Sequence, residues 1–458
     1  MGFFKAYDMR GTYGVDFDLA TVREVGRALV EVVGGSRWLV GRDCRVTSEK
    51  VHAALVEGLR KAGADVTDIG LCTTPMVYFF TAQDDFDGSV MVTASHNPPG
   101  DNGLKVSMKT ALPVGYANGL DKVESLVKER LAGVDRASYE SAPTEPVDNS
   151  PYVRRYVEWM RSHGGEISSS LKYGVDCSNG MSSILVHELF PGAVVINDVL
   201  DGRFPNHSPN PLKAEAREQL AALVREKSLD FGIIFDGDAD RAMFVDERGE
   251  FIQPDYLTPF VAAATFEAMK LKPDGEKVVY DVRTSRGAIE TLSEMGCECM
   301  MVPVGHAFAK PILREGGAVC GGELAGHYYF REFFCCDSGV LAALRILRCV
   351  AKAAQEGKRV SEMVASVNSR YANSGELNFK VEDKDAAIKR VLAAASMKLP
   401  MELSRTEIDG VRIEYKEGWI NIRKSNTEPY LRLIVESATR QQLDRWVKIL
   451  SDAISPQN

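Results

Sequence analysis

The sequence predicts an α/β protein with three mixed-sheet, helix-sandwiched α/β domains and a smaller C-terminal α+β domain. The first observation is length, because 458 residues are about three times the usual size of one domain. The second is an alternation of helices and strands up to about residue 370, which is typical of layered α/β units. The third is a change near residue 373, after which short alternating strands precede a final helix.

The first domain is predicted to span residues 1–148. Asp18 is placed to cap a helix whose apolar residues recur at helical spacing as far as Val33, and a buried strand follows at 38–40. Ser48 is placed to cap the next helix, which stops at Gly63 before a strand around 66–69. A polar, proline-bearing segment at 141–146 marks the end of this domain.

The other three domains are predicted at residues 149–250, 251–370 and 371–458. In the second we expect a helix at 152–162, strands at 173–177 and 193–197, a helix at 213–227 and a strand at 231–235. The third contains a strand from Lys277 and ends in a long helix from about Asp337. In the fourth, strands at 411–415, 419–422 and 431–435 are closed by a helix from about Thr439.

The composition is that of a globular protein with an excess of acidic groups. A net charge of −9 and a pI near 5.5 argue against nucleic acid or an anionic membrane surface as a partner. No stretch approaches the ~18 uninterrupted apolar residues of a membrane span. Nine irregularly spaced cysteines match neither a disulfide framework nor a zinc site, so we expect a reducing, cytoplasmic location.

The first motif with chemical meaning is Thr93-Ala94-Ser95-His96-Asn97-Pro98, which follows an apolar strand. Because α/β proteins place their sites at strand ends, a serine beside a histidine is a candidate nucleophile or phosphate carrier. The alternative is a serine turn in a connecting loop. The hydrolase motif Gly-x-Ser-x-Gly is absent, which disfavours acyl transfer.

The second motif is Asp236-Gly237-Asp238-Ala239-Asp240-Arg241, between two apolar segments. Three carboxylates at alternate positions of an extended loop supply the oxygen ligands that Mg²⁺ prefers. Ca²⁺ is disfavoured because Arg241 replaces the glycine that an EF-hand requires and strands flank the loop. The alternative is a solvated hairpin turn.

Two further segments carry polar residues among glycines or between strands. Glu323 and His327 lie four residues apart in a glycine-rich turn, where both reach one polar ligand or serve only as caps. Gly305-His306 is read on its own as a polar helix start. Residues 423–427 read Arg-Lys-Ser-Asn-Thr between two strands, a density of donors that suits a phosphate dianion and exceeds that of a plain hairpin turn.

Together the four segments indicate phosphoryl chemistry. A serine, a Mg²⁺ site and an oxyanion site occur in a chain that has neither Gly-x-x-x-x-Gly-Lys-Ser/Thr nor Gly-x-Gly-x-x-Gly, so no nucleotide cradle is visible. The phosphate must therefore come from the substrate or be stored on the protein. A phosphoserine is a suitable store because phosphate monoesters hydrolyse very slowly in water.

These motifs resemble those of the α-D-phosphohexomutase superfamily, and within it the bacterial phosphomannomutase/phosphoglucomutase group. The resemblance covers essentially the whole chain and also rests on residues 4–11, 41–43 and 102–105. It implies four domains around a central cleft, each contributing one loop, which agrees with the predicted number of domains.

The resemblance implies a role for each matching residue. The implied ligands of Mg²⁺ are a phosphate oxygen on Ser95 and the carboxylates of Asp236, Asp238 and Asp240. The implied catalytic residues are Ser95, Arg10, Lys105, His306 and His327, of which the last three are unranked acid and base candidates. The implied substrate-binding residues are Tyr7, Arg241, Glu323, Arg423, Ser425, Asn426 and Thr427.

The implied activity is the interconversion of hexose 1-phosphate and hexose 6-phosphate, of mannose, glucose or both, through a phosphoserine and a hexose 1,6-bisphosphate. The implied cofactors are Mg²⁺ and, as activator, glucose or mannose 1,6-bisphosphate; the partner is a small hexose phosphate, and the protein is a monomer or homodimer. Ala325 departs from the serine that the family usually has, whereas Asn426 favours mannose and glucose over glucosamine. The alternatives are a phosphoglucosamine mutase and a sugar-phosphate phosphatase or binding protein.

Overall fold

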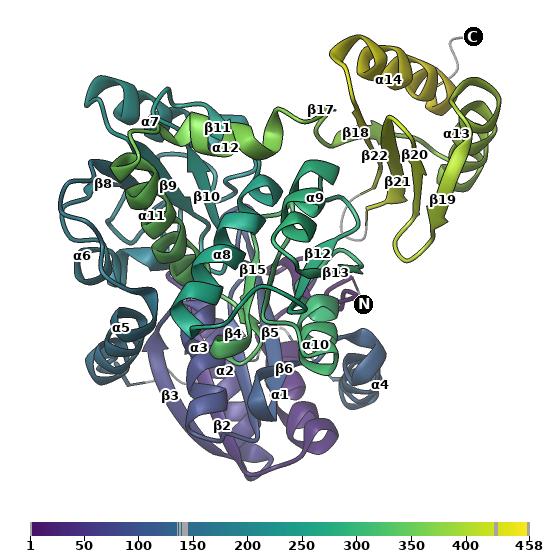
Figure 1. Ribbon diagram of the computed structural model, residues 1–458. Coiled ribbons are helices and arrows are strands. Elements are labelled where there is room, and N and C mark those ends of the chain that lie inside the picture. Colours follow the sequence, from purple (N-terminus) through teal and green to yellow (C-terminus); the bar gives the residue numbers. More distant parts are fainter. Residues whose placement is uncertain (1, 135, 137–138, 140–144, 426–428, 456–458) are drawn as a thin grey trace.

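The structure, a computed structural model, describes residues 2–134, 136, 139, 145–425 and 429–455 (Figure 1). These residues form four sheets of six, five, five and six strands, each built from consecutive elements of the chain. The four units are called domains I to IV in chain order. The predicted fold class, three α/β domains and a C-terminal α+β domain, is confirmed.

Domain I comprises strands β1 (Met9–Thr12), β2 (Arg37–Arg42), β3 (Asp65–Leu71), β4 (Gly88–Val92), β5 (Asp101–Met108) and β6 (Leu112–Pro113), and helices α1 (Leu19–Val33), α2 (Ser48–Lys61), α3 (Thr74–Gln83) and α4 (Leu120–Arg130). The sheet order is β1-β5-β4-β2-β3, with β6 beside β5. β2 is parallel to β3 and β4, whereas β5 is antiparallel to β4 and β1.

Two predicted helix caps of this domain have different outcomes. Asp18 caps α1, because its Oδ1 accepts a hydrogen bond from Thr21 N–H at 2.8 Å. The prediction for Ser48 is wrong: α2 begins at Ser48, Thr47 is the capping position, and the Ser48 hydroxyl donates to the buried Asp43 carboxylate instead. The competing acceptor, Asp43, lies five residues before Ser48, and the turn between β2 and α2 brings its carboxylate to the Ser48 hydroxyl.

Domain II comprises helices α5 (Ser150–Gly164), α6 (Val186–Leu189) and α7 (Ala214–Glu226), and strands β7 (Tyr173–Asp176), β8 (Val194–Ile196), β9 (Phe231–Phe235), β10 (Ala242–Val245) and β11 (Phe251–Ile252). The order is β11-β10-β9-β7-β8, in which β7 is parallel to both neighbours and β9 and β10 form an antiparallel pair. Since β11 pairs with β10, this sheet continues past the predicted boundary at residue 250.

Domain III comprises strands β12 (Lys277–Asp281), β13 (Glu298–Val302), β14 (Cys320–Gly322), β15 (Tyr328–Phe330) and β16 (Cys336–Asp337), and helices α8 (Thr258–Met269), α9 (Arg286–Glu294), α10 (His306–Gly316), α11 (Gly339–Gln355) and α12 (Val360–Asn368). The order is β13-β12-β14-β15-β16. β12 is parallel to β13 and β14, and the rest of the sheet is antiparallel.

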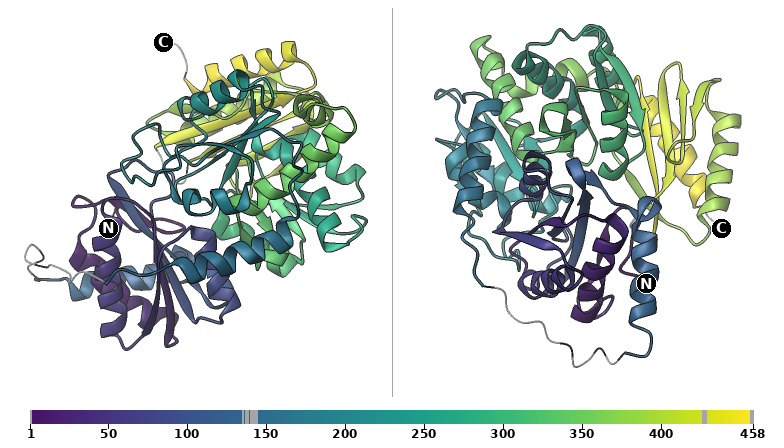
Figure 2. Two further views of the ribbon diagram at one scale, coloured as in Figure 1. Left: turned by 90° about the vertical axis from the view of Figure 1, so that its left-hand side faces the viewer. Right: turned by 90° about the horizontal axis from the view of Figure 1, so that it is seen from below.

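Domain IV comprises strands β17 (Ala372–Asn373), β18 (Leu377–Lys380), β19 (Glu402–Thr406), β20 (Val411–Tyr415), β21 (Gly418–Lys424) and β22 (Tyr430–Ser437), and helices α13 (Lys384–Lys398) and α14 (Arg440–Ile454). Its sheet is antiparallel in the order β17-β22-β21-β20-β19, and β18 also pairs with β22. The predicted helix start at Thr439 is confirmed, because Thr439 caps α14. Domain IV lies beside domain III in Figures 1 and 2.

The hydrophobic core divides unequally among the domains. One cluster of buried side chains runs through domains I, II and III and includes Phe79 of α3, Tyr156 of α5 and Phe333. Helices α1, α2 and α4 cover the other face of the domain I sheet with a separate cluster. Domain IV has its own core, and Leu324 of domain III packs against its Trp419 and Ile434.

Two expectations about the whole chain bear on this description. Within the ranges described above, no helix is both long enough and apolar enough to cross a membrane. All nine cysteines fall within those ranges and are free thiols, as the irregular spacing predicts.

Candidate active site

Ser95 lies on the loop that joins β4 to β5 and is fully buried. Its φ of +50° is in the left-handed region that residues other than glycine rarely adopt, so the surroundings must hold it there. Arg45 does so: its Nη2 donates to the carbonyl oxygens of Ser95 and Asn97 at 2.8 and 2.7 Å. The Ser95 hydroxyl in turn donates to Asp236 Oδ2 of domain II at 2.7 Å.

The predicted metal ligands lie on the loop between β9 and β10. The carboxylates of Asp236, Asp238 and Asp240 are fully buried, and one oxygen of each lies within 4.8 Å of the others. Lys105 Nζ of β5 lies 2.7 Å from Asp238 Oδ2 and 2.5 Å from Asp240 Oδ2. Domains I and II therefore meet in a cluster of buried charges.

These carboxylates fit a divalent cation. Asp238 Oδ1 and Asp240 Oδ1 are buried and accept no hydrogen bond from any residue that the structure describes. Burial, with the charges of Asp240 and Asp238, holds the pKa of Asp236 well above its ordinary value. Burial also opposes ionisation of Asp240, but Lys105, His327 and Arg241 together outweigh it and lower that pKa. Lys105 and, at 3.8–3.9 Å, Arg241 oppose the charges of the three carboxylates but leave Asp236 hard to ionise, and a hard cation with oxygen ligands would complete the balance.

Arg10 and His96 lie against the same cluster. Arg10 Nη1 donates to Asn97 Oδ1 of the Ser95 loop at 3.1 Å, and Nη2 donates to Asp8 Oδ2 at 2.6 Å. His96 Nδ1 lies 3.2 Å from Ser95 Oγ. Burial, followed by the positive charges of Arg241 and Arg10, lowers the pKa of His96 well below its ordinary value, so this ring is neutral.

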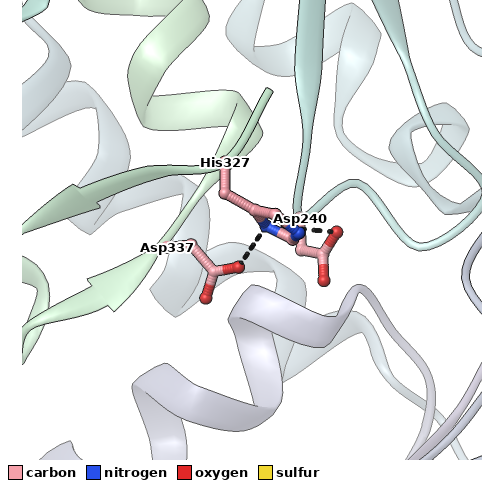
Figure 3. Close-up of side chains that lie close together, drawn as sticks. All are labelled: Asp240, His327 and Asp337. Carbon is pink, nitrogen blue, oxygen red and sulfur yellow. Dashed lines mark ion pairs between the residues drawn. The ribbon is translucent and has the colours of Figure 1, made fainter. Parts of the chain in front are cut away.

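His327 connects the carboxylate cluster to domain III (Figure 3). Arg241 Nε donates to His327 Nε2 at 2.9 Å, so the proton of the neutral ring resides on Nδ1. Nδ1 lies 2.6 Å from Asp337 Oδ2 and 3.9 Å from Asp240 Oδ1. On the side away from the ring, Lys310 Nζ is 2.7 Å from Asp337 Oδ1. The orientation and tautomer of His327 are therefore fixed by charged neighbours.

Glu323 and Tyr7 lie near the start of α10. Glu323 is buried, and its carboxylate accepts hydrogen bonds from Tyr329 and, at 3.2 Å, from the backbone N–H of Gly305. Burial raises the pKa of Glu323. Tyr7 of domain I donates to Val304 O at 3.3 Å. His306 is the first residue of α10, and its side chain lies outside the described part of the structure.

The fourth predicted segment begins with the last two residues of β21. Arg423, the penultimate residue of that strand, is 2% exposed, with Nη2 3.4 Å from Glu376 Oε2 and Nη1 3.7 Å from Asp409 Oδ2. Ser425 donates its backbone N–H to Tyr430 O at 2.9 Å, which closes the hairpin. Asn426 and Thr427 lie outside the described residues.

Models of the Phosphoglucomutase/phosphomannomutase family match all four domains. The alpha/beta/alpha domains I, II and III match residues 1–132, 151–249 and 253–371, and the C-terminal domain matches residues 376–453. This chain belongs to the phosphoglucomutase/phosphomannomutase family. The predicted resemblance is thereby confirmed.

Curated members of this family are similar over nearly their full length. A protein named "Phosphohexose mutases" from Xanthomonas campestris is 37% identical over 438 residues, covering 95% of this chain and 94% of the relative. A "Phosphomannomutase" from Methanocaldococcus jannaschii is 33% identical, covering 99% and 97%. A solved family protein from Burkholderia thailandensis has a TM-score of 0.82 at 30% identity, covering 100% of this chain and 98% of its own.

Four residues that sequence reasoning missed contact the predicted site of this phosphoglucomutase/phosphomannomutase family member: Arg45, Arg283, Glu376 and Asp337. Arg283 follows the carboxyl end of the parallel strand β12, where the strand-end rule applied to Ser95 would have found it. The other three belong to no local motif. Only their tertiary contacts distinguish them from ordinary caps and surface charges.

Proposed function

We propose that this chain interconverts hexose 1-phosphates and hexose 6-phosphates, with Ser95 as the phosphate carrier. The observation that carries the proposal is the buried hydroxyl of Ser95 at 2.7 Å from Asp236, with Lys105 between Asp238 and Asp240. The relatives named phosphohexose mutase and phosphomannomutase support the same class of reaction. A phosphoglucosamine mutase is the second mutase candidate.

In the first half-reaction the bond between phosphorus and Ser95 Oγ breaks while a bond to a sugar hydroxyl oxygen forms, which yields a hexose 1,6-bisphosphate. In the second half-reaction Ser95 Oγ bonds to the phosphorus of the other phosphoryl group while the bond from that phosphorus to its sugar oxygen breaks. This oxygen takes back the proton lost in the first half-reaction, and the isomeric monophosphate leaves. Arg10, Lys105 and Arg241 place positive charge around the transferring group, where the loose transition state spreads negative charge over oxygen atoms.

The contacts rank two of the proposed acid and base residues. Burial opposes the charge of Lys105, but Asp238 and Asp240 raise its pKa above the ordinary value, so Lys105 stays protonated and acts as a fixed cation. Nε2 of His327 accepts a hydrogen bond from Arg241, and Asp337 holds the other ring nitrogen. In our proposal Nε2 accepts the hydroxyl proton once substrate displaces Arg241 from it.

Ser95, Asp236, Asp238 and Asp240 would hold Mg²⁺, whose oxygen-ligand preference they fit. When bound it supplies charge stabilisation for the phosphoryl oxygens. Tyr7 and Glu323 are proposed to contact the sugar, and Arg423 with Ser425, Asn426 and Thr427 to hold the phosphate that does not react.

Intact-mass measurement of wild type and Ser95→Ala tests the carrier. We expect one added phosphoryl group on wild type after incubation with glucose 1,6-bisphosphate, none on Ser95→Ala, and mutase activity only in wild type with Mg²⁺. Excess chelator should abolish that activity. Equal turnover by the two proteins would refute the carrier assignment, and release of free phosphate without an isomerised sugar would establish a phosphatase.

Sugar preference is tested by comparing kcat/KM for mannose, glucose and glucosamine 1-phosphates. We expect turnover of the first two and much slower turnover of the third, because Asn426 is typical of the mannose and glucose branch. Similar values for all three sugars would contradict this expectation and would point to the loss of a hydroxyl at Ala325.

A further inference from the structure

The carboxylate of Glu376 lies among three guanidinium groups at the junction of domains III and IV. Its Oε1 is 2.8 Å from Arg432 Nη1, and its Oε2 is 3.4 Å from both Arg283 Nη1 and Arg423 Nη2. Arg283 belongs to domain III, whereas Arg423 and Arg432 belong to domain IV. Glu376 therefore links the two domains electrostatically.

The backbone holds Glu376 at this place. Glu376 directly precedes β18, and β18 pairs with β22 from Leu377 opposite Leu433 onward. The chain turns immediately before it at Gly375, whose φ is +66° and whose N–H donates to Asn373 Oδ1 at 2.8 Å. The side chain of Glu376 is 19% exposed. A carboxylate anchored at the start of a paired strand has little freedom to leave its arginine partners.

The arginines require a nearby negative charge. Arg423 and Arg432 stand directly opposite one another on β21 and β22, where like charges destabilise a sheet. Burial, followed by the charge of Arg283, lowers the pKa of Arg423. Burial also disfavours ionised Glu376, but Arg283, Arg423 and Arg432 together hold the pKa of Glu376 below its ordinary value. Glu376 is therefore ionised and offsets the repulsion among the three guanidinium groups.

The same contacts lead to the proposed sugar site. Arg283 Nη2 lies 2.6 Å from Asp281 Oδ2 and 3.7 Å from Glu323 Oε2. A continuous series of ion pairs thus runs from Glu323 through Arg283 and Glu376 to Arg423. Its ends are the groups proposed above to contact the sugar and the non-reacting phosphate.

We propose that Glu376 is a positioning residue for the mutase reaction, which holds Arg283 and Arg423 at the spacing that one hexose phosphate requires. This inference rests on the proposed function. The non-reacting phosphate is bound alike in the ground state and the transition state, so loss of this positioning weakens both equally. It then raises KM and leaves kcat nearly unchanged.

The test compares wild type with Glu376→Gln, which keeps the shape and removes the charge. Glu402→Gln is the matched control, because Glu402 is an exposed residue of domain IV that pairs with Arg405. We expect KM for glucose 1-phosphate to rise about tenfold in Glu376→Gln with kcat within about twofold, and no change beyond about twofold in the control. The calorimetric Kd for glucose 1-phosphate, measured in chelator, should rise in parallel.

A double-mutant cycle separates positioning from a general structural role. If Glu376 acts through Arg283 and Arg423, the variants that combine Glu376→Gln with Arg283→Gln or with Arg423→Gln should each bind better than the sum of their single effects on Kd predicts. Additive effects on Kd, an unchanged KM in Glu376→Gln, or a loss confined to kcat would overturn the inference. If Glu376→Gln does not fold, Glu376→Asp takes its place with the same expected division between KM and kcat.

The outcomes also distinguish this inference from the proposed function. If wild type neither turns over nor binds glucose 1-phosphate, the proposed function fails. If wild type does both and Glu376→Gln matches it, only the role of Glu376 fails.

Discussion

Asp255, a residue outside the candidate active site, carries the clearest consequence for stability. It lies between β11 and α8 and is fully buried, with Oδ2 accepting from Ser285 N–H and Oδ1 from Gln253 Nε2, both at 2.8 Å. Burial, together with the charges of Glu436 and Asp281, raises the pKa of Asp255 to about 7.

This shift predicts that stability falls as pH rises. The unfolded carboxyl ionises near pH 4, whereas the folded one binds its proton up to about pH 7. Burial of Asp255 therefore does not lower the free energy of unfolding below the unfolded pKa. The loss of stability grows between the two pKa values and is complete above the folded pKa, where it is on the order of a few kcal/mol. Asp255→Asn should remove that part of the pH dependence.

The measurement is the urea midpoint of wild type and Asp255→Asn at pH 5 and pH 8. We expect the variant to gain stability relative to wild type on going from pH 5 to pH 8. The exposed Asp452→Asn should show no such gain. A constant difference between wild type and Asp255→Asn at both pH values would rule out the shift.

At the scale of elements, the loop that carries Ser95 and the loop between β9 and β10 touch backbone to backbone. A Cβ on Gly237 would lie 2.5 Å from Ser95 O, so no side chain fits between the two loops. Gly100 is the last residue of the loop that carries Ser95, and a Cβ there would meet no atom within 4 Å. Alanine at Gly100 is therefore a matched control for alanine at Gly237.

We predict that Gly237→Ala pushes the loops apart and lowers kcat/KM by about 100-fold, because a small misplacement of reacting groups is that costly. Gly100→Ala should retain activity within about twofold. Steady-state measurement of kcat/KM for the two variants tests this prediction, with circular dichroism to verify folding. Comparable activities would show that the loops need no such contact.

At the scale of the whole molecule, domains I to III share one core and domain IV has its own. Among the residues that the structure describes, the buried apolar cluster shared by domains III and IV is small, Leu324, Trp419 and Ile434, and polar contacts accompany it, such as Arg412 Nη1 donating to Val282 O at 2.7 Å. Because little apolar surface resists a rotation there, domain IV is the unit most able to move.

We predict that domain IV closes when substrate binds, since Arg423 must hold one phosphate while Ser95 meets the other. The segment that connects the two domains, residues 369–371 between α12 and β17, can absorb the change in dihedral angle. Small-angle scattering with a saturating glucose 1-phosphate analogue that lacks the 6-hydroxyl should show a smaller radius of gyration. Arg423→Ala should show no change, and identical curves for free and bound wild type would mean a preformed site.

The sequence by itself determined the fold class, the order of domains and the four polar loops. Apolar periodicity and strand ends are local properties, so Asp18, β9 and the loops at 95 and 236–241 could be read without a structure. It also predicted that Asp236, Asp238 and Asp240 act together, because carboxylates at alternate positions of an extended loop supply oxygen ligands for a cation.

Only the tertiary structure decided how those residues pair. Lys105 of domain I bridges two carboxylates of domain II, and Arg241 of domain II donates to His327 of domain III. Glu376 meets an arginine 93 residues away in the chain. The physical reason is that a charge removed from water must find its counter-charge in space, and that partner is selected by how the four domains pack, which no local pattern records.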